Sequence, residues 1–547
     1  MVKGDDSNCP QPKSSGFPPA ANERKLSMKP ISGLSRKIFL KMNPPSEEDC
    51  RSSQARILDA LKEKGISASF SAAALRQLYP LCENAGWKVT ASLGWNGALW
   101  EILYLEAGDT EKSHYGLAVD LGSTSVYMRV LNCKSGETIE EASAYNRQIA
   151  FGEDILTRIF YAKDNPAHLD EIRRATIRTL TDLLSSLCDK TGIAPSEYLA
   201  MVVSGNMTMI HFLIGLDPFC IFQTPYAVRS DAPGFLRGTD LDLPIAGYVY
   251  CVPGKANYLG GDIISGILAT GIYEEDKISL FFDVGTNGEL AVGNRSFLLC
   301  GAGAAGPALE GGVVHTGMRA APGAVESVSL ANGEFHLKTI DDKVPAGICG
   351  SGIVDLLSEL FLNGWINLQG VLQPEKSSLI SIQKNPDTGM EEAAVCYSSG
   401  LYFYQSDIRE FINTKAAAAT MIEYMLHASG IRLEDIDTFY MAGAFGAHIH
   451  KESAINIGMY PDVERDRICP VGNTSLKGAS KLLLNKDLLT DIDRILDLMS
   501  YVQFGAVDNF VEMMQAASAL PHTDGRRYPS VMKKLREREA HRELQNN

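Results

Sequence analysis

Two segments of this chain share one plan: an apolar strand that ends in an aspartate, a turn that contains glycine, and a return strand. The first is GLAVDLGSTSVYMRVL, residues 116–131, and the second is LFFDVGTNGELAVG, residues 280–293. Their aspartates, Asp120 and Asp283, lie 163 residues apart. A plan that recurs at this distance predicts an internal duplication, in which two related lobes each present one such hairpin.

The texture between and after these hairpins is that of an α/β fold. From residue 115 to about residue 521, strands that end in glycine turns alternate with helices. We expect one two-lobed domain over residues 115–521 and a small α/β domain before it, over residues 36–110. In the small domain, two helices end near Gly65 and Gly86, and two strands pair around a WNG turn.

Both ends of the chain differ from this pattern. Residues 1–35 are rich in Pro, Ser, Gly and Asn and are expected to form a disordered tail, because they cannot bury enough apolar surface to offset the entropy of ordering. Residues 522–547 are highly charged and are expected to form a charged tail.

The two hairpins suit phosphate binding. Small residues let a turn approach a polyphosphate, and successive N–H groups form an anion-binding nest. Asp120 and Asp283 are predicted to hold Mg²⁺, mainly through water, because Mg²⁺ keeps much of its hydration shell. The candidate phosphate-binding residues are Gly122, Ser123, Thr124 and Ser125 in the first turn, and Gly285, Thr286 and Asn287 in the second.

Two further features complete the candidate nucleotide site. Glu289 follows the second turn and could orient water toward the γ-phosphate, although a surface charge at a strand end explains it equally well. In the third glycine segment, DTFYMAGAFGAHI, Gly443 and Gly446 would admit a base and ribose close to the backbone. One such turn alone is usually an ordinary hairpin, but the three segments in this order predict ATP binding.

Composition excludes several classes of partner. Hydrophobic residues make up 45% of the 547 residues and charged residues 21%, as in globular proteins. A net charge of −15 argues against nucleic acid or an anionic membrane surface as partner. The chain has no apolar run long enough to span a bilayer and its first residues lack an apolar signal core, so we expect a cytoplasmic protein.

The eleven cysteines are scattered, and no two form a C-x-x-C pair. Iron–sulfur and zinc modules need such clusters, so the spacing predicts no iron–sulfur cluster. One alternative is a cluster that bridges two chains through Cys300, with Cys349 as a second ligand. Burial of both as small apolar residues is the favoured interpretation.

Several polar residues have simple structural explanations. Asn206 and Thr208 lie where a strand gives way to a helix, and capping accounts for them. His211 and His315 have no convincing partner spacing. His448 and His450 form an H-x-H pair that could bind a metal, although a solvated turn is the favoured interpretation.

The order of motifs resembles the phosphate-1, phosphate-2 and adenosine motifs of the acetate and sugar kinase, chaperone-ATPase and actin superfamily. A narrower resemblance rests on five longer segments. They are YNRQIAFGEDILTRI (residues 145–159), SGNMTMIHFLIGLDP (204–218), AAGPALEGG (304–312), GICGSGIVD (347–355) and VGNTSLKGA (471–479). In these segments, and over about residues 36–520, the chain resembles the ATP-dependent reductive activators of corrinoid proteins.

This resemblance implies a function. The family returns an inactivated Co(II) corrinoid to Co(I), so that a methyltransferase system can work again. It implies ATP and Mg²⁺, a corrinoid protein as partner, and a homodimer. Such activators usually carry a ferredoxin-like iron–sulfur domain, and this sequence shows none, so a separate ferredoxin-like electron donor is expected. The alternatives are a regulatory ATP-binding homologue without redox activity and a small-molecule kinase of the same fold, which would need an acidic general base.

Overall fold

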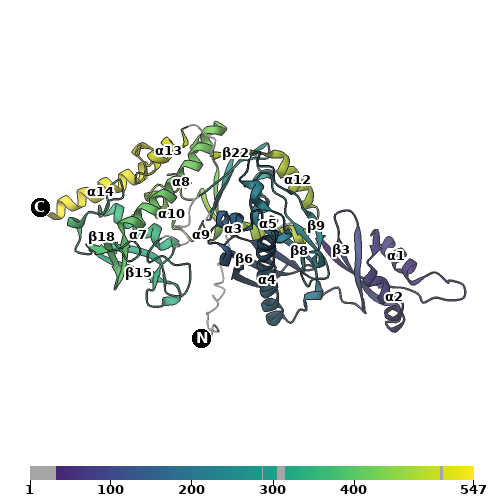
Figure 1. Ribbon diagram of the computed structural model, residues 1–547. Helices are drawn as coiled ribbons and strands as arrows, with labels where there is room; N and C mark the ends of the chain where they lie inside the picture. Colours follow the sequence, from purple (N-terminus) through teal and green to yellow (C-terminus); the bar gives the residue numbers. More distant parts are fainter. Residues whose placement is uncertain (1–31, 286, 305–313, 447, 505–508, 547) are drawn as a thin grey trace, which may run out of the picture. The chain divides into compact units, whose positions relative to one another are not determined.

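The computed structural model describes residues 32–546 apart from residues 286, 305–313, 447 and 505–508. The chain folds into two compact units (Figure 1). The N-terminal unit runs to Gly271 and takes back Thr474–Met499, whereas the C-terminal unit comprises Ile272–Asn473 and Ser500–Asn547. None of the helices in the described residues is long and apolar enough to cross a membrane.

The small domain lies within the N-terminal unit. Its two predicted helices are confirmed as α1 (Ser53–Glu63) and α2 (Ala72–Asn84), each capped by a serine hydroxyl, and they share one apolar core with the sheet. The predicted hairpin is also confirmed, and two strands that were not predicted flank it. The strand order is β1-β3-β4-β2, with β1 (Ser35–Lys41), β2 (Ala68–Phe70), β3 (Lys88–Trp95) and β4 (Trp100–Ala107).

A six-stranded sheet forms the rest of the N-terminal unit, in the order β7-β6-β5-β8-β10-β9. The first three strands along the chain form an antiparallel meander, and β8 and β10 follow parallel to β5. The strands are β5 (Tyr115–Leu121), β6 (Ser125–Asn132), β7 (Thr138–Tyr145), β8 (Tyr198–Gly205), β9 (Gly234–Arg237) and β10 (Tyr248–Cys251). The helices around them are α3 (Ile155–Ala162), α4 (Pro166–Thr191), α5 (Met207–Ile214), α6 (Gly261–Thr270), α11 (Thr474–Leu484) and α12 (Leu488–Leu498).

The central sheet of the C-terminal unit repeats this plan, in the order β21-β20-β11-β12-β13-β22. Again three strands form an antiparallel meander, and two strands, β20 and β21, follow parallel to the first. The strands are β11 (Ser279–Val284), β12 (Asn287–Asn294), β13 (Phe297–Ala304), β20 (Thr438–Ala442), β21 (Ile468–Gly472) and β22 (Met499–Gln503). The predicted duplication and two-lobed fold are confirmed.

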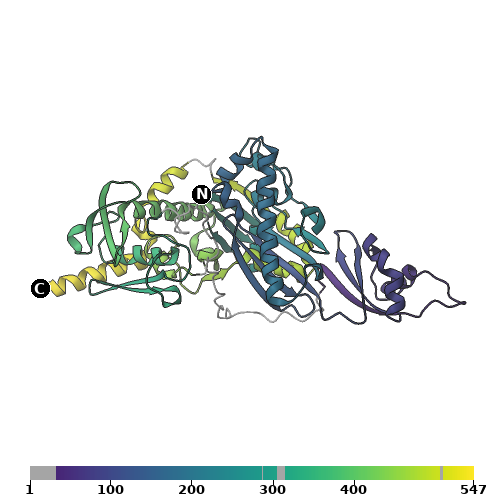
Figure 2. The same ribbon diagram turned by 60° about the horizontal axis from the view of Figure 1, so that its bottom comes forward.

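The C-terminal unit also holds two three-stranded sheets, β15-β14-β16 and β17-β18-β19 (Figure 2). Their strands are β14 (Ala324–Ala331), β15 (Glu334–Thr339), β16 (Gly347–Ile348), β17 (Ile380–Lys384), β18 (Glu391–Ser398) and β19 (Leu401–Tyr404). The helices are α7 (Gly350–Leu362), α8 (Gln405–Ser429), α9 (Gly443–Gly446), α10 (Lys451–Asn456), α13 (Phe510–Ala517) and α14 (Pro529–Asn546). One apolar core joins all of these layers.

The segment expected to be a charged tail begins as packed structure. Tyr528 and Val531, at the start of α14, are 7% and 0% exposed and belong to the core of the C-terminal unit. Just before them, the buried Lys415 ammonium donates to the carbonyls of Ala519 and Pro521, at 2.6 and 2.7 Å. The sequence analysis missed this packing because charged residues dominate the segment and only a few apolar positions hold it in place.

Candidate functional site

The first predicted phosphate turn, Gly122 to Ser125, is fixed through the carbonyl groups of its first three residues. The Asn146 side chain donates to the carbonyl of Gly122 at 2.9 Å, and its backbone N–H donates to that of Thr124 at 2.9 Å. The Arg158 guanidinium donates to the carbonyl of Ser123 at 2.6 Å. A Cβ on Gly122 would lie 2.4 Å from the carbonyl oxygen of Ser125, so only glycine fits this turn.

These bonds set the direction of the N–H groups of the turn. In a planar trans peptide, the C=O of one residue and the N–H of the next point in opposite directions. Because the carbonyls of Gly122 and Ser123 point toward Asn146 and Arg158, the N–H groups of Ser123 and Thr124 face the other way. Two successive N–H groups turned outward from a glycine turn form the beginning of an anion-binding nest.

Asn146 and Arg158, which hold the turn, come from a segment that the sequence analysis did not place in the site. Asn146 begins the segment that follows β7, and Arg158 lies on α3 with none of its surface exposed. The Arg158 guanidinium also donates to the carbonyls of Gly152 and Glu153, at 2.7 and 3.2 Å. Residues 145–159 therefore support the turn, which gives this family-like segment a physical role.

Asp120 lies near the end of β5, beside residues from distant parts of the chain. Its Oδ1 accepts a hydrogen bond from the Ser475 hydroxyl at 2.7 Å, and Ser475 Oγ also lies 2.9 Å from Ser204 Oγ on β8. Ser475 lies in the first turn of α11, which packs on α6 so closely that a Cβ on Gly478 would lie 2.1 Å from the carbonyl oxygen of Ser265. The carboxyl ends of parallel strands and two helix starts thus meet at Asp120, where α/β sheets bind ligands.

Asp262 is a second acidic residue at this place that the sequence analysis missed. It lies in the first turn of α6. Burial and the nearby negative charge of Asp120 raise the pKa of Asp262, whose carboxylate accepts the N–H of Ile263. The preceding Gly260 packs on the end of β8, where a Cβ would lie 2.4 Å from the Cα of Asn206. The signal in the sequence was the Gly-Gly-Asp at a helix start.

In the C-terminal unit, the structure brings two predicted residues into contact. Asp283 is half-buried near the end of β11, and Ala442 of β20 is its neighbour in parallel register. The next residue, Gly443, has φ +85°, and a Cβ there would lie 2.6 Å from Asp283 Oδ1. The second aspartate and the third glycine segment therefore form one half-site. Gly446 ends the short helix α9, where a Cβ would lie 3.1 Å from the carbonyl carbon of Met441.

Glu289 faces the same side of this sheet as Asp283, because the two are antiparallel neighbours on β11 and β12. Glu289 is only 9% exposed, so it is not the surface charge that the alternative interpretation required. Gly285 lies in the turn between these strands. Thr286 lies outside the described residues, and Asn287 starts β12.

The acidic residues suit a magnesium ion that is bound together with a nucleotide. In the described residues, no group of three or more His, Cys, Asp or Glu side chains could hold a metal ion. Mg²⁺ in such sites is commonly held by one or two carboxylates, water and substrate phosphates. Asp120, held by a hydroxyl, and Asp283, against a glycine backbone, fit that arrangement.

The structure also shows the surroundings of the cysteines, histidines and capping residue that the sequence analysis considered. Cys300 and Cys349 are 0% and 4% exposed, which suits small core residues better than ligands that reach a second chain. Asn206 caps α5, as predicted. His211 is buried and satisfied by Met207 O and Arg229 N. His448 and His450 are exposed, as the solvated-turn interpretation predicts, and His450 Nδ1 in addition lies 2.8 Å from the buried carboxylate of Asp355.

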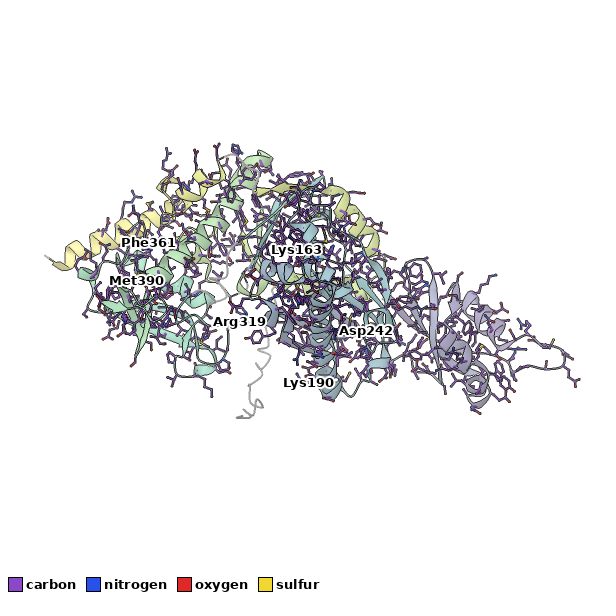
Figure 3. The ribbon with its side chains drawn as sticks, viewed as in Figure 1. Lys163, Lys190, Asp242, Arg319, Phe361 and Met390 are labelled. Atoms are coloured by element: carbon purple, nitrogen blue, oxygen red, sulfur yellow. The ribbon has the colours of Figure 1, made fainter. Side chains whose placement is uncertain are left out.

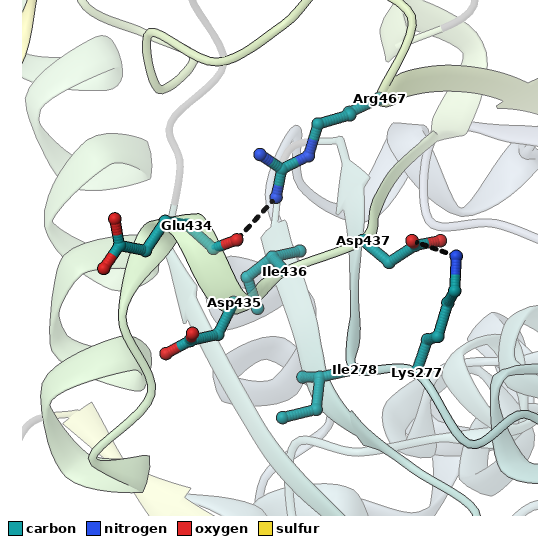
Figure 4. A pocket seen from close by; sticks show the side chains of 7 residues that line it. All are labelled: Lys277, Ile278, Glu434, Asp435, Ile436, Asp437 and Arg467. Carbon is teal, nitrogen blue, oxygen red and sulfur yellow. Dashed lines mark hydrogen bonds and ion pairs between the residues drawn. The ribbon is translucent and has the colours of Figure 1, made fainter.

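A separate pocket of about 300 Å³ lies at the far end of β11 and β20 from Asp283 (Figure 4). Lys277 pairs with Asp437 there at 2.6 Å, and the Arg467 guanidinium donates to the carbonyl of Glu434 at 3.2 Å. These polar groups are engaged within the protein, and they lie just before the starts of the strands. The pocket is therefore not part of the nucleotide half-site.

Models of three regions of one protein family match successive parts of the chain. "RACo linker region" matches residues 21–112, "RACo middle region" matches residues 115–275, and "C-terminal domain of RACo the ASKHA domain" matches residues 277–532. The boundaries at residues 112–115 and 275–277 coincide with the start of β5 and with the loop before β11.

Individual proteins agree with these matches. The "Corrinoid activation enzyme RamQ" of Eubacterium limosum is 32% identical over 424 residues, which are 75% of this chain and 71% of that protein. The "[Co(II) methylated amine-specific corrinoid protein] reductase" of Methanosarcina barkeri is 24% identical over 70% of this chain and 72% of its own. The solved structure of a "Reductive activator for corrinoid,iron-sulfur protein" superimposes with a TM-score of 0.86 and 32% identity, over 92% of this chain and 82% of that one.

Proposed function

This chain belongs to the RACo family of corrinoid-protein reductive activators, and we propose that it uses ATP to return an inactive Co(II) corrinoid to Co(I) so that methyl transfer resumes. The observation that carries the ATP part is the pair of half-sites. Each unit places an aspartate at the end of a strand beside a glycine turn, and in the C-terminal unit Gly443 lies directly against Asp283.

We assign the roles within these half-sites as follows. The N–H groups of Ser123 and Thr124, with the hydroxyls of Thr124 and Ser125, bind phosphate oxygens. Gly285, Thr286 and Asn287 do the same from the second turn, and Gly443 and Gly446 lie against the adenosine. Asp120 and Asp283 hold Mg²⁺, which neutralises charge on the phosphates when bound. Glu289 orients the water that attacks the γ-phosphate.

ATP serves here as a ligand that shifts a conformational equilibrium. In one conformation, this protein binds the corrinoid protein with weakened axial ligation at cobalt. The cobalt of a corrinoid protein bound in this way is easier to reduce than that of the free corrinoid protein. ATP favours that state only to the extent that it binds it more tightly, and a change from 1:99 to 99:1 requires about a 10⁴-fold difference in affinity.

Further assignments concern the electron donor, the location and the assembly. A separate ferredoxin-like protein supplies the electrons, since the cysteines of these 547 residues form no C-x-x-C pair. The ten described cysteines form no disulfide, which supports a cytoplasmic location. We also propose a homodimer and a methyltransferase system as the context, on family resemblance alone.

The test is anaerobic absorbance spectroscopy of a Co(II) corrinoid protein with this protein, Mg²⁺–ATP and a low-potential reductant. The two probes are a methylated-amine-specific corrinoid protein and a corrinoid iron–sulfur protein. We expect the Co(I) band to rise only when both ATP and the protein are present. Asp283→Ala should abolish the rise, whereas Asp276→Ala, a matched control at a side chain that is 74% exposed, should not.

Other outcomes would redirect the assignment. ATP binding without any Co(I) in either probe would indicate a regulatory homologue. Phosphorylation of an added alcohol or acid, lost in Asp262→Asn, would instead indicate a kinase. Full activation by Asp283→Ala would contradict the role given to this half-site.

A further inference from the structure

Helix α3 (Ile155–Ala162) has two faces with different surroundings. Arg158 is fully buried on one face and binds the phosphate turn through the carbonyl of Ser123. Leu156 and Phe160 are 45% and 56% exposed. Because residues four apart lie on the same side of a helix, and Arg158 lies midway between them in sequence, the exposed pair is on the opposite side from Arg158.

The exposed pair continues onto a neighbouring segment. The Phe160 ring meets the ring of Phe219 edge to face, with centroids 5.8 Å apart. The Lys163 ammonium lies 4.0 Å from the centroid of the Phe219 ring, just past the end of α3 (Figure 3). Leu156, Phe160, Lys163 and Phe219 therefore form one surface, the α3 patch, with an apolar centre of three side chains and one cation at its edge.

The connection between the two faces is short and stiff. Asp154 caps α3 by accepting both the N–H and the hydroxyl of Thr157, at 2.8 and 2.7 Å. Arg158 follows directly and binds three backbone carbonyls, those of Ser123, Gly152 and Glu153. A movement of α3 must therefore move the phosphate turn or break buried hydrogen bonds to a charged group, which are the costly ones to lose.

We propose that the α3 patch is the docking surface for the corrinoid protein, and that α3 couples this docking to nucleotide binding at the first phosphate turn. This inference rests on the proposed function, because it takes the corrinoid protein as the partner. It adds two things to that function. The first is the surface that receives the partner, and the second is Arg158 as the residue through which ATP and the partner change each other's binding affinity.

The size of the patch selects this occupant over a second copy of the chain. Stable homodimers bury about 800 Å² or more per partner, with a largely apolar centre. Three apolar side chains on and beside an eight-residue helix provide only part of such a surface. An activator must release each corrinoid protein after reduction, so a small apolar centre with one cation at its edge suits its substrate protein.

The first experiment replaces an exposed side chain that makes no contact with the turn. Phe160→Asp should raise the Kd for the Co(II) corrinoid iron–sulfur protein or the methylated-amine-specific corrinoid protein, whichever the wild type activates, at least tenfold. The Kd for ATP should change less than twofold. Co(I) formation should recover at high corrinoid-protein concentration, as a raised KM with unchanged kcat. The matched control is Val511→Asp on α13, a helical position that is 68% exposed, which should leave all three quantities unchanged.

The second experiment tests the coupling. Binding linkage is reciprocal, so in the wild type the corrinoid protein should tighten ATP binding by the same factor by which ATP tightens corrinoid-protein binding. Arg158→Lys should reduce this factor toward one, because one ammonium cannot reach all three carbonyls, while corrinoid-protein affinity without ATP stays within about twofold. If Arg158→Lys does not fold, Asp154→Ala, which removes the cap that fixes the start of α3, should lower the same linkage factor.

Three results would overturn the inference. The first is an unchanged corrinoid-protein Kd in Phe160→Asp. The second is a change of oligomeric state in Phe160→Asp by light scattering, which would make the patch an interface between copies. The third is an undiminished linkage factor in a folded Arg158→Lys. Failure of the wild type to produce Co(I) would instead count against the proposed function, so the two failures are distinguishable.

Discussion

At the scale of single residues, Gly443 is needed both for its backbone conformation and for the space that it leaves to Asp283. Its φ of +85° costs any other residue about 1–2 kcal/mol, and a Cβ would press on Asp283 Oδ1 at 2.6 Å. We expect Gly443→Ala to lose more than tenfold in ATP affinity by titration calorimetry. The control is Gly430→Ala, with φ +66° and open space around its Cβ, which should lose stability but not ATP affinity. Equal ATP affinities would count against the half-site.

Glu289 and Asp262 are rival candidates for orienting the attacking water. Glu289 is 9% exposed beside Asp283, whereas Asp262 lies near Asp120 with a pKa raised by burial and by that charge. If Glu289 has the role, Glu289→Gln should lower the ATPase rate by about 10²–10⁴-fold with an ATP Kd within threefold of wild type. Asp262→Asn should then keep most of the rate. The reverse pattern in steady-state assays would transfer the role to Asp262.

At the scale of elements, helix α14 depends on a few apolar contacts. Val531 is fully buried in the core of the C-terminal unit. Val531→Ala removes about two methyl groups from this core and should cost about 2 kcal/mol of unfolding free energy. Val511→Ala, at a position 68% exposed, should stay within about 0.5 kcal/mol. Urea unfolding of both variants measures the difference, and equal costs would mean that α14 does not contribute to this core.

Helix α10 is fastened to α7 by an ion pair that titrates. The pKa of His450 is raised by its hydrogen bond to Asp355, with burial opposing and the Asp355 charge adding to the shift. A raised folded-state pKa contributes stability below the unfolded pKa, and that stability is lost as pH rises through the folded pKa. The melting temperature of the wild type relative to His450→Gln should therefore be highest below about pH 6 and fall toward pH 8.5. A difference that does not change with pH would contradict the ion pair.

At the scale of the molecule, the small domain is held to the sheet that carries Asp120. The Glu101 carboxylate accepts two hydrogen bonds from Arg237, at 2.7 and 2.8 Å, and one from the Tyr248 hydroxyl. Glu101→Gln leaves Arg237 without its counter-ion, so we expect faster proteolysis within residues 108–114, the connection between the domain and β5. Lys338→Gln, which breaks an exposed pair in the other unit, is the control. Unchanged cleavage would mean that packing alone holds the domain.

Much of this architecture could be predicted because its signals are local. The duplicated strand, aspartate and glycine turn predicted both hairpins, and serine caps and terminal glycines predicted α1 and α2. The strands β1 and β2 were missed because short edge strands of mixed burial show little alternation. The packing of α14 was missed because two buried side chains are a weak signal within a charged segment.

The sequence by itself determined the duplicated α/β fold, the family, and the residue types that suit phosphate and Mg²⁺, because turn chemistry and strand ends depend on neighbours within a few positions. Only the tertiary structure placed Ser475 on Asp120 across 355 positions, and Arg158 on Ser123 across 35. Such contacts depend on which strand ends and helix starts meet at a sheet edge. That outcome is decided by the packing of whole elements, for which no short stretch of sequence carries the information.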